Sequence, residues 1–124
     1  MPRVLDKVDL LAAARALGVA WVPDTVAAFN GHHVQVLRVE EAFEWHHHRH
    51  TDDLFLALDE QVHIDLRERT VTLARGELFV VPANVEHRLR ADVPAHVLCI
   101  EHLGDSGPVA DARVLEAEEP ARPG

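Results

Sequence analysis

Cysteine is nearly absent from the sequence, and so are long apolar runs. The 124 residues include one cysteine, Cys99, so no internal disulfide can form. No apolar run approaches the roughly 20 residues of a membrane-spanning helix. The segment from Met1 to Asp6 lacks the apolar core of a signal peptide. We therefore expect a cytoplasmic protein with no membrane partner.

Basic residues are also scarce. Lys and Arg total 12 against 21 Asp and Glu, so the formal net charge is −9. Sequence-independent binding of DNA or RNA needs clustered Lys and Arg, and this balance argues against it and against docking on anionic lipid. The hydrophobic fraction of 48% is enough for one packed core, and the length is that of a single domain.

Helical periodicity occurs in one segment, near the N-terminus. Apolar residues recur at helical spacing between Leu10 and Leu17, which predicts a helix over residues 6–17. Asp6 is the expected N-cap, and Gly18 stands where the helix would stop. We expect this helix to serve as a lid or a dimer contact.

The rest of the sequence predicts short strands, because residues typical of turns recur every eight to twelve residues. Asn30-Gly31 has the composition of a hairpin turn. The expected strands cover residues 26–29, 32–40, 54–58, 61–67, 71–73, 78–81, 85–90 and 95–103. This pattern predicts an all-β sandwich or barrel, with the jelly roll among the candidates.

Alternation of apolar and polar residues predicts which side chains enter the core. In the strand 61–67 we expect Val62, Ile64 and Leu66 inside, with His63, Asp65 and Arg67 outside. We also expect Leu54, Leu56, Ile64 and Val80 to pack the barrel around the candidate site.

Four of the ten histidines fall within five positions, as His46, His47, His48 and His50. On a strand, residues i and i+2 point the same way, so His46 and His48 share one face. A carboxylate follows, from Asp52 or Asp53, and His87 lies in a later strand that can return beside this one. Imidazoles with a carboxylate form the donor set that a divalent transition metal requires.

Two alternatives stay open at this stage. Asp52 fits the spacing of the carboxylate as well as Asp53 does. His50 would share the face of His46 and His48 if the strand stayed regular, and we expect a turn near Thr51 to remove it from that face.

The spacing of these residues resembles the two motifs of the cupin superfamily, G-x5-H-x-H-x(3,4)-E-x6-G and G-x5-P-x-G-x2-H-x3-N. The matching positions are His46, His48, Asp53 and Glu60 for the first motif, and Gly76, Pro82, Asn84, His87 and Ala91 for the second. Asp53 stands for the motif's Glu, Glu60 and Asn84 for glycines, and Ala91 for an Asn. Asn tolerates the left-handed backbone that such a turn needs.

The resemblance covers roughly residues 33–103 and looks closest to small single-domain cupins described as similar to mannose-6-phosphate isomerase. It implies a double-stranded β-helix, divided into an N-terminal helix and extension (1–30), a barrel (31–104) and a C-terminal tail (105–124). It also implies a divalent metal (Zn, Fe, Mn or Ni) on His46, His48, Asp53 and His87, and a homodimer.

Three functions are compatible with this resemblance. The first is an enzyme that acts on a small oxygenated molecule, as a sugar isomerase or epimerase or as a dioxygenase. The second is a metal-containing module that binds or senses a small molecule without converting it. The third is a metal-free scaffold. A further titratable side chain inside the barrel would favour the enzyme.

Overall fold

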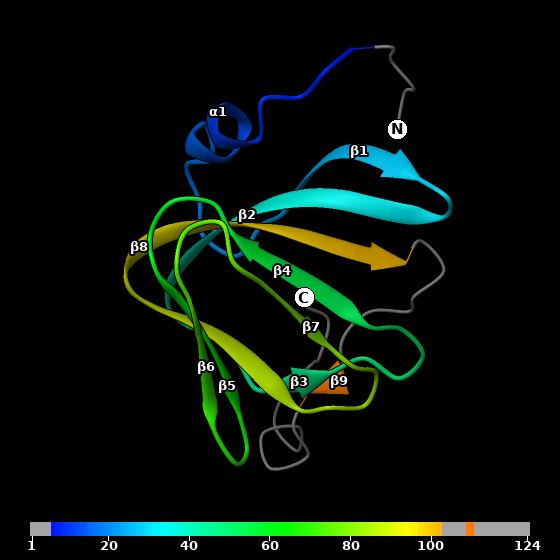
Figure 1. Ribbon diagram of the computed structural model, residues 1–124, viewed down its shortest axis with the longest axis vertical. Helices are drawn as coiled ribbons and strands as arrows, with labels where there is room; N and C mark the ends of the chain where they lie inside the picture. Colours follow the sequence, from blue (N-terminus) through cyan, green and yellow to red (C-terminus); the bar gives the residue numbers. More distant parts are fainter. Residues whose placement is uncertain (1–5, 103–108, 111–124) are drawn as a thin grey trace.

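The computed structural model describes residues 6–102 and 109–110, and it confirms an all-β protein with one short helix (Figure 1). The elements are α1 (Leu10–Arg15), β1 (Asp24–Phe29), β2 (His32–Ala42), β3 (His46–His47), β4 (Asp53–Ala57), β5 (Val62–Leu66), β6 (Thr70–Leu73), β7 (Leu78–Val81), β8 (His87–His102) and β9 (Val109–Ala110). Within the described residues, no helix is long and apolar enough to cross a bilayer.

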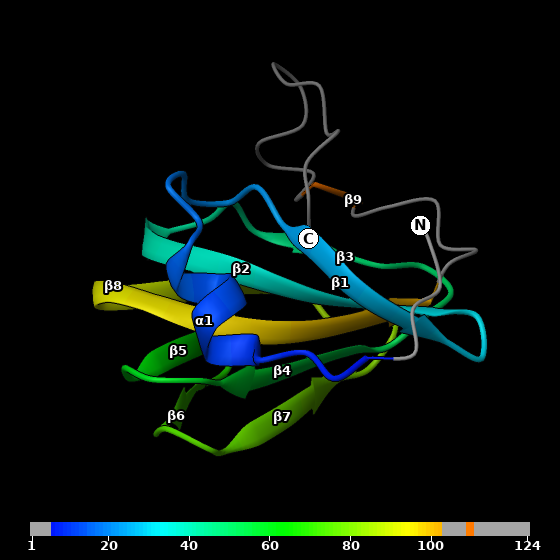
Figure 2. The same ribbon diagram turned by 90° about the horizontal axis from the view of Figure 1, so that it is seen from above.

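The long strand β8 organises the barrel because it takes part in both halves of the sheet. Its first part pairs antiparallel with β5 and with β3, and its last part lies between β2 and β4. Strand β1 extends the sheet beyond β2, β7 extends it beyond β4, and β6 pairs with β5. Figure 2 shows these strands curling around a common interior.

The predicted break between strands 85–90 and 95–103 is wrong, since β8 runs unbroken from His87 to His102. The intervening residues Asp92 to Pro94 are exposed and have no strand partner, while pairing resumes on either side at Ala91 and Ala95. Because Pro94 has no N–H to donate, it is tolerated at this unpaired bend of an extended chain.

The helix is shorter than predicted. It begins at Leu10 and ends at Arg15, and its N-cap is Asp9, whose side chain accepts a hydrogen bond from the backbone N–H of Ala12. Asp6, the predicted cap, instead accepts from the neighbouring N–H of Lys7. Ala14 is fully buried where the helix packs against β2 and β8.

The hairpin turn at Asn30-Gly31 is confirmed. Both residues have positive φ, 45° and 77°, as a two-residue turn of the favoured hand requires. Asn84, which replaces a motif glycine, has a φ of 70° and so adopts the left-handed conformation that asparagine tolerates.

The core is formed by the inward residues of the central strands. Its members are Leu37, Val39, Phe55, Ala57, Val62, Ile64, Leu66, Leu73, Val81, Leu89, Ala91, Ala95, Val97 and Cys99. Of the predicted core residues Ile64 is confirmed, while Leu54 and Leu56 are half-buried on the outer face and Val80 is 41% exposed. In β4 the inward positions belong to Asp53, Phe55 and Ala57, and because strand side chains alternate, the two leucines point outward.

The predicted faces of β5 are correct, but Asp65 on the outer face is buried rather than exposed. This carboxylate is buried because it accepts hydrogen bonds from Thr70, Arg88 and Arg90. The Arg90 guanidinium, together with the other two donors, holds the pKa of Asp65 well below its usual range. A buried carboxylate is tolerated where it is paired in this way.

Candidate metal centre

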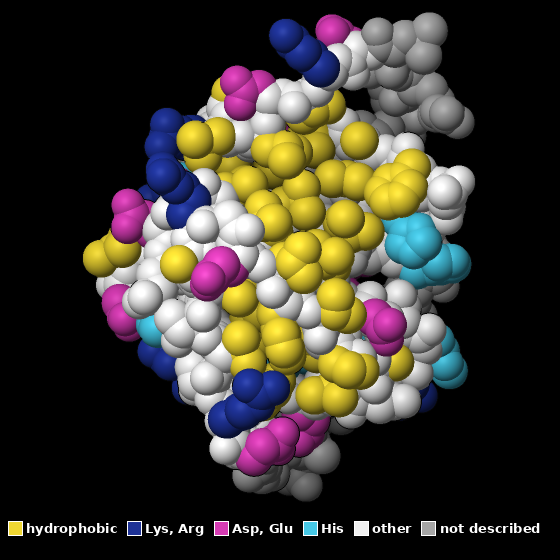
Figure 3. Space-filling view, viewed as in Figure 1, with side chains coloured by type: hydrophobic (Ala, Val, Ile, Leu, Met, Phe, Trp, Pro, Cys, Tyr) yellow, Lys and Arg dark blue, Asp and Glu magenta, His cyan; other side chains and the backbone are white. Residues whose placement is uncertain are grey.

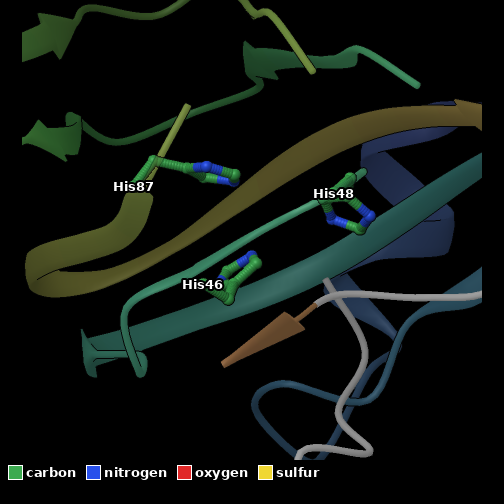
Figure 4. A group of neighbouring side chains, drawn as sticks. All are labelled: His46, His48 and His87. Carbon is green, nitrogen blue, oxygen red and sulfur yellow. The ribbon is translucent and has the colours of Figure 1, made fainter. Parts of the chain in front are cut away.

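Three histidines from distant parts of the chain converge inside the barrel (Figure 4). His46 starts β3 and is paired with His87 at the start of β8, and His48 follows two residues after His46 on the same face. The ring centroids lie 4.4 Å apart for His46 and His87, 5.6 Å for His46 and His48, and 6.2 Å for His48 and His87. The convergence predicted from the sequence is thereby confirmed.

Backbone carbonyls fix the orientation of two of the rings. Nδ1 of His46 donates to the carbonyl of Glu44 at 2.9 Å, and Nδ1 of His87 donates to the carbonyl of Val85 at 2.8 Å. Because Nδ1 carries the proton, Nε2 presents its lone pair. Both Nε2 atoms are buried and have no hydrogen-bond partner among the described residues.

Burial keeps these imidazoles neutral. Desolvation, reinforced by the neighbouring His87, lowers the pKa of His46 to about 3. Desolvation also lowers the pKa of His87. At neutral pH both rings are therefore in the unprotonated form that binds a metal.

Asp53 brings a carboxylate to the same point. It is the first residue of β4 and is 1% exposed. Its Oδ2 lies 2.8 Å from Nε2 of His48 and 3.8 Å from Nε2 of His87. Neither carboxylate oxygen has a hydrogen-bond partner among the described residues, so the short contact to His48 is not aligned as a hydrogen bond.

The two alternatives left open by the sequence lie elsewhere. Asp52 points to the loop after β7, where its Oδ1 accepts a hydrogen bond from the N–H of Ala83 at 2.9 Å. His50 is exposed on a bend, as expected from a turn near Thr51. Of the residues considered, Asp53 is the carboxylate beside the three histidines.

Aromatic side chains surround the histidines. Phe43 meets the His46 ring edge-on at 5.4 Å and stacks on Trp21 at 4.8 Å, and Phe55 lies 6.0 Å from His87. The Trp45 ring, one residue before His46, stacks with Arg67, whose guanidinium carbon lies 3.9 Å from the ring centroid. Phe43 and Phe55 therefore pack beside two of the three histidines.

The sequence interpretation missed one residue of this region, Glu101. A carboxylate oxygen of Glu101 lies within 4.8 Å of ligand atoms of both His48 and Asp53. Glu101 follows the inward, buried residues Val97 and Cys99 at two-residue steps, and that alternation was the available signal. Burial, with the Asp53 and Glu101 carboxylates nearby, raises the pKa of the Cys99 thiol, so this cysteine is not a thiolate ligand.

The donor set fits a divalent transition metal. One nitrogen from each of His46, His48 and His87 lies within 4.8 Å of the others. Neutral imidazoles and one carboxylate are the ligands that zinc, iron, manganese and nickel use in proteins. Buried lone pairs of His46, His87 and Asp53 that meet no hydrogen-bond partner in the described part of the chain are the feature that such an ion would satisfy.

The fold and this histidine cluster define a small β-barrel protein of the double-stranded β-helix class. The chain belongs to the cupin domain family, whose model matches residues 33–101. It is 30% identical over 95 residues to the uncharacterized protein YdbB of Bacillus subtilis, covering 76% of this chain and 84% of that protein.

Solved structures show the same fold. A cupin-2 domain containing protein of Shewanella frigidimarina aligns with a TM-score of 0.74 and 28% identity, over 77% of this chain and 93% of that one. A hydroquinone 1,2-dioxygenase of Sphingomonas sp. TTNP3, solved with 4-hydroxybenzoate, aligns with a TM-score of 0.64 and 18% identity, over 82% and 80% of the two chains. These likenesses support a small single-domain cupin, and none of these three proteins is named as a mannose-6-phosphate isomerase.

Proposed function

We propose that this cupin is a metal-dependent enzyme that acts on a small oxygenated molecule. His46, His48, His87 and Asp53 would hold one divalent ion. The observation that carries the proposal is a set of three buried imidazoles whose ring nitrogens lie within 4.8 Å of one another, with the Asp53 carboxylate beside His48 and His87. Such an ion, when bound, supplies a Lewis acid for an oxygen atom of the ligand.

The residues around the ion would prepare the site before a ligand arrives. The carbonyls of Glu44 and Val85 hold two rings in the metal-binding tautomer. The three rings are at most 4% exposed, and a low dielectric around them strengthens electrostatic interactions between the donors and a ligand. Glu101 is a further titratable group beside the metal-facing donors, and this favours an enzyme over a module that only binds its ligand.

The test is elemental analysis of protein purified without a chelator. We expect about one equivalent of a first-row transition metal per chain. Less than about one tenth of an equivalent, with no rebinding of zinc, iron, manganese or nickel, would support the metal-free scaffold instead.

Two assays then separate the candidate reactions. Oxygen consumption with hydroquinone and related phenols tests for dioxygenase activity. This reaction is included because the fold resembles that of the Sphingomonas hydroquinone 1,2-dioxygenase. Isomerisation of sugars and sugar phosphates tests the other candidate. Metal-loaded protein that binds a small molecule and converts none of these substrates would favour the binding module.

We further propose that the protein forms a homodimer through the outer face of the sheet β2–β8–β4–β7. The paired registers of these strands place eight aliphatic side chains on this face: Val34, Val36, Leu54, Leu56, Leu78, Val80, Leu98 and Ile100. Val36 and Leu98 are buried within the chain, where α1 packs against β2 and β8, so the other six would form the contact. Figure 3 shows hydrophobic side chains gathered over this face. None of the eight is charged, so two copies of a chain with net charge −9 can meet here without repulsion.

Replacing Val80 with Lys should dissociate the dimer. Val80 is 41% exposed on β7, and a lysine there would place a charge within the apolar contact. Light scattering should report twice the 13.8 kDa chain mass for the wild type and the chain mass for the variant. Val93→Lys is the matched control, since Val93 is 52% exposed and lies at the unpaired bend of β8. A monomeric wild type would refute the proposal.

A further inference from the structure

The strand that carries His46 is short. β3 is two residues long, meets β8 at the single pair of His46 with His87, and pairs with β9 on its other side. Backbone hydrogen bonds hold the two ends of the surrounding segment: the N–H of Phe43 donates to a carbonyl of β8 at 3.0 Å, and the carbonyl of His48 accepts from the N–H of Asn84 at 2.7 Å. Between these ends, side-chain contacts to neighbouring strands add to what fixes the position of His46.

Trp45, directly before His46, makes such a contact. The guanidinium carbon of Arg67, which follows β5, lies 3.9 Å from the centroid of the Trp45 ring, and that of Arg88 in β8 lies 5.2 Å from it. A guanidinium within about 6 Å of a tryptophan ring centroid is attracted to the face of the ring. Trp45 is therefore attached to two neighbouring strands.

Both arginines are held in place by carboxylates. Nε of Arg67 donates to Oε1 of Glu86 at 3.0 Å, and Nε of Arg88 donates to Oδ2 of Asp65 at 2.8 Å. Asp65 is 6% exposed and accepts further hydrogen bonds from β6 and β8. Because charge-assisted hydrogen bonds are strong and directional, they keep both guanidiniums beside the Trp45 ring.

This contact lies directly behind two of the metal-facing histidines. Arg88 alternates along β8 with the inward residues His87 and Leu89, so it and the ring that it contacts are on the outer face. His46 and His87 are the closest pair among the three histidines, with ring centroids 4.4 Å apart. A shift of the Trp45 backbone would therefore change the spacing of this pair.

We propose that Trp45 is a positioning residue for the metal centre. Held by two arginines on the outer face, its ring keeps the backbone of His46 in place opposite His87. This inference rests on the proposed metal centre, and it assigns to the outer face of the barrel a part in the affinity for the ion.

The test measures the zinc affinity of the full-length protein at neutral pH, by competition with a chromophoric chelator. Trp45→Ala should lower the affinity at least tenfold, as loss of a contact that orients metal ligands typically does. Trp45→Phe retains an aromatic face and should stay within threefold of the wild type. The visible absorption spectrum of the cobalt-loaded protein reports ligand geometry, so it should change in Trp45→Ala and be retained in Trp45→Phe.

A second variant tests the same contact from the other side. Arg67→Met keeps an aliphatic side chain and removes the guanidinium, and it should lower the zinc affinity at least threefold. Combined with Trp45→Ala it should add nothing, because both substitutions remove one contact. If circular dichroism shows that Trp45→Ala does not fold, Arg67→Met decides the test, and a loss below threefold overturns the proposal.

Two variants serve as controls. Arg69→Met removes another arginine–aromatic contact, in which the guanidinium carbon of Arg69 lies 5.9 Å from the centroid of the Phe79 ring, and it should leave the zinc affinity unchanged. Leu73→Ala truncates a core side chain of β6 that is 3% exposed. It should lower the stability to urea and leave the zinc affinity unchanged.

Zinc stoichiometry of the wild type separates this inference from the proposed function. A wild type that holds no zinc refutes the metal centre, and the inference with it. If the wild type holds one equivalent, a loss of affinity below tenfold in folded Trp45→Ala, an equal loss in Leu73→Ala, or an unchanged cobalt spectrum in Trp45→Ala overturns the positioning role of Trp45 and leaves the metal centre intact.

Discussion

Replacing His48 with alanine should reduce the metal content of the purified protein at least tenfold. The three imidazoles provide most of the donor set, and losing one removes a neutral nitrogen ligand from a buried site whose remaining donors are fixed for four-fold binding, which weakens the hold on the ion. Elemental analysis of protein purified without a chelator gives the metal content. His48→Ala that retains one equivalent would show that His48 is not a ligand.

The matched control is His50→Ala. His50 lies two residues further along the chain, is exposed, and is outside the cluster, so its removal should leave the metal content unchanged. The barrel should stay folded in both variants because the core around Phe55, Ile64 and Val97 does not depend on His48. In the presence of a chelator we expect His48→Ala to lie within about 2 kcal/mol of the wild type in free energy of unfolding, as for truncation of one buried side chain.

Metal-free protein should lose stability as the pH falls below about 6.5, well before its carboxylates titrate. Burial keeps His46 neutral in the folded state down to a pKa of about 3, against 6.5 for an ordinary, exposed histidine. Between these values the unfolded chain binds a proton that the folded chain does not, so the free energy of unfolding falls as the pH falls. His87, whose pKa is also lowered, acts in the same direction.

The expected magnitude can be given for His46. One such group changes the free energy of unfolding by about 1.4 kcal/mol per pH unit once the unfolded state is fully protonated at that site. Between pH 6.5 and pH 5 this amounts to roughly 1.5 kcal/mol, to which His87 adds. Asp65 has a lowered pKa and contributes only below its unfolded value of 3.8, so the window above pH 5 isolates the histidines.

The measurement is urea-induced unfolding in a chelator at several pH values between 5 and 7.5. His46→Gln should flatten the dependence, because glutamine has no proton to gain. A wild-type stability that is constant over this window, or that rises toward pH 5, would contradict the burial of neutral histidines in the metal-free protein.

Local patterns were sufficient to predict the histidine cluster. His46 and His48 share a face because they are two residues apart on a strand, and the motif spacing brought His87 into the same set. The hairpin at Asn30-Gly31 was equally predictable, since the left-handed conformation of both residues is a local property.

In a continuous apolar run, residue spacing does not show which side chains face the core. Leu54, Phe55 and Leu56 are all apolar, so their sequence contains no alternation that tells the inner face from the outer. The pairing of β4 with β7 and β8 decides it, and it turns Phe55 inward and both leucines outward.

Sequence alone established the all-β fold, the cupin resemblance and the three histidines, because each depends on residue spacing along one strand or on motifs a few residues long. Only the tertiary structure decided that Asp53 rather than Asp52 faces the histidines, and that Glu101 joins them. Both depend on which residues of β4 and β8 lie opposite each other, and a shift of one residue would turn either carboxylate to the outside.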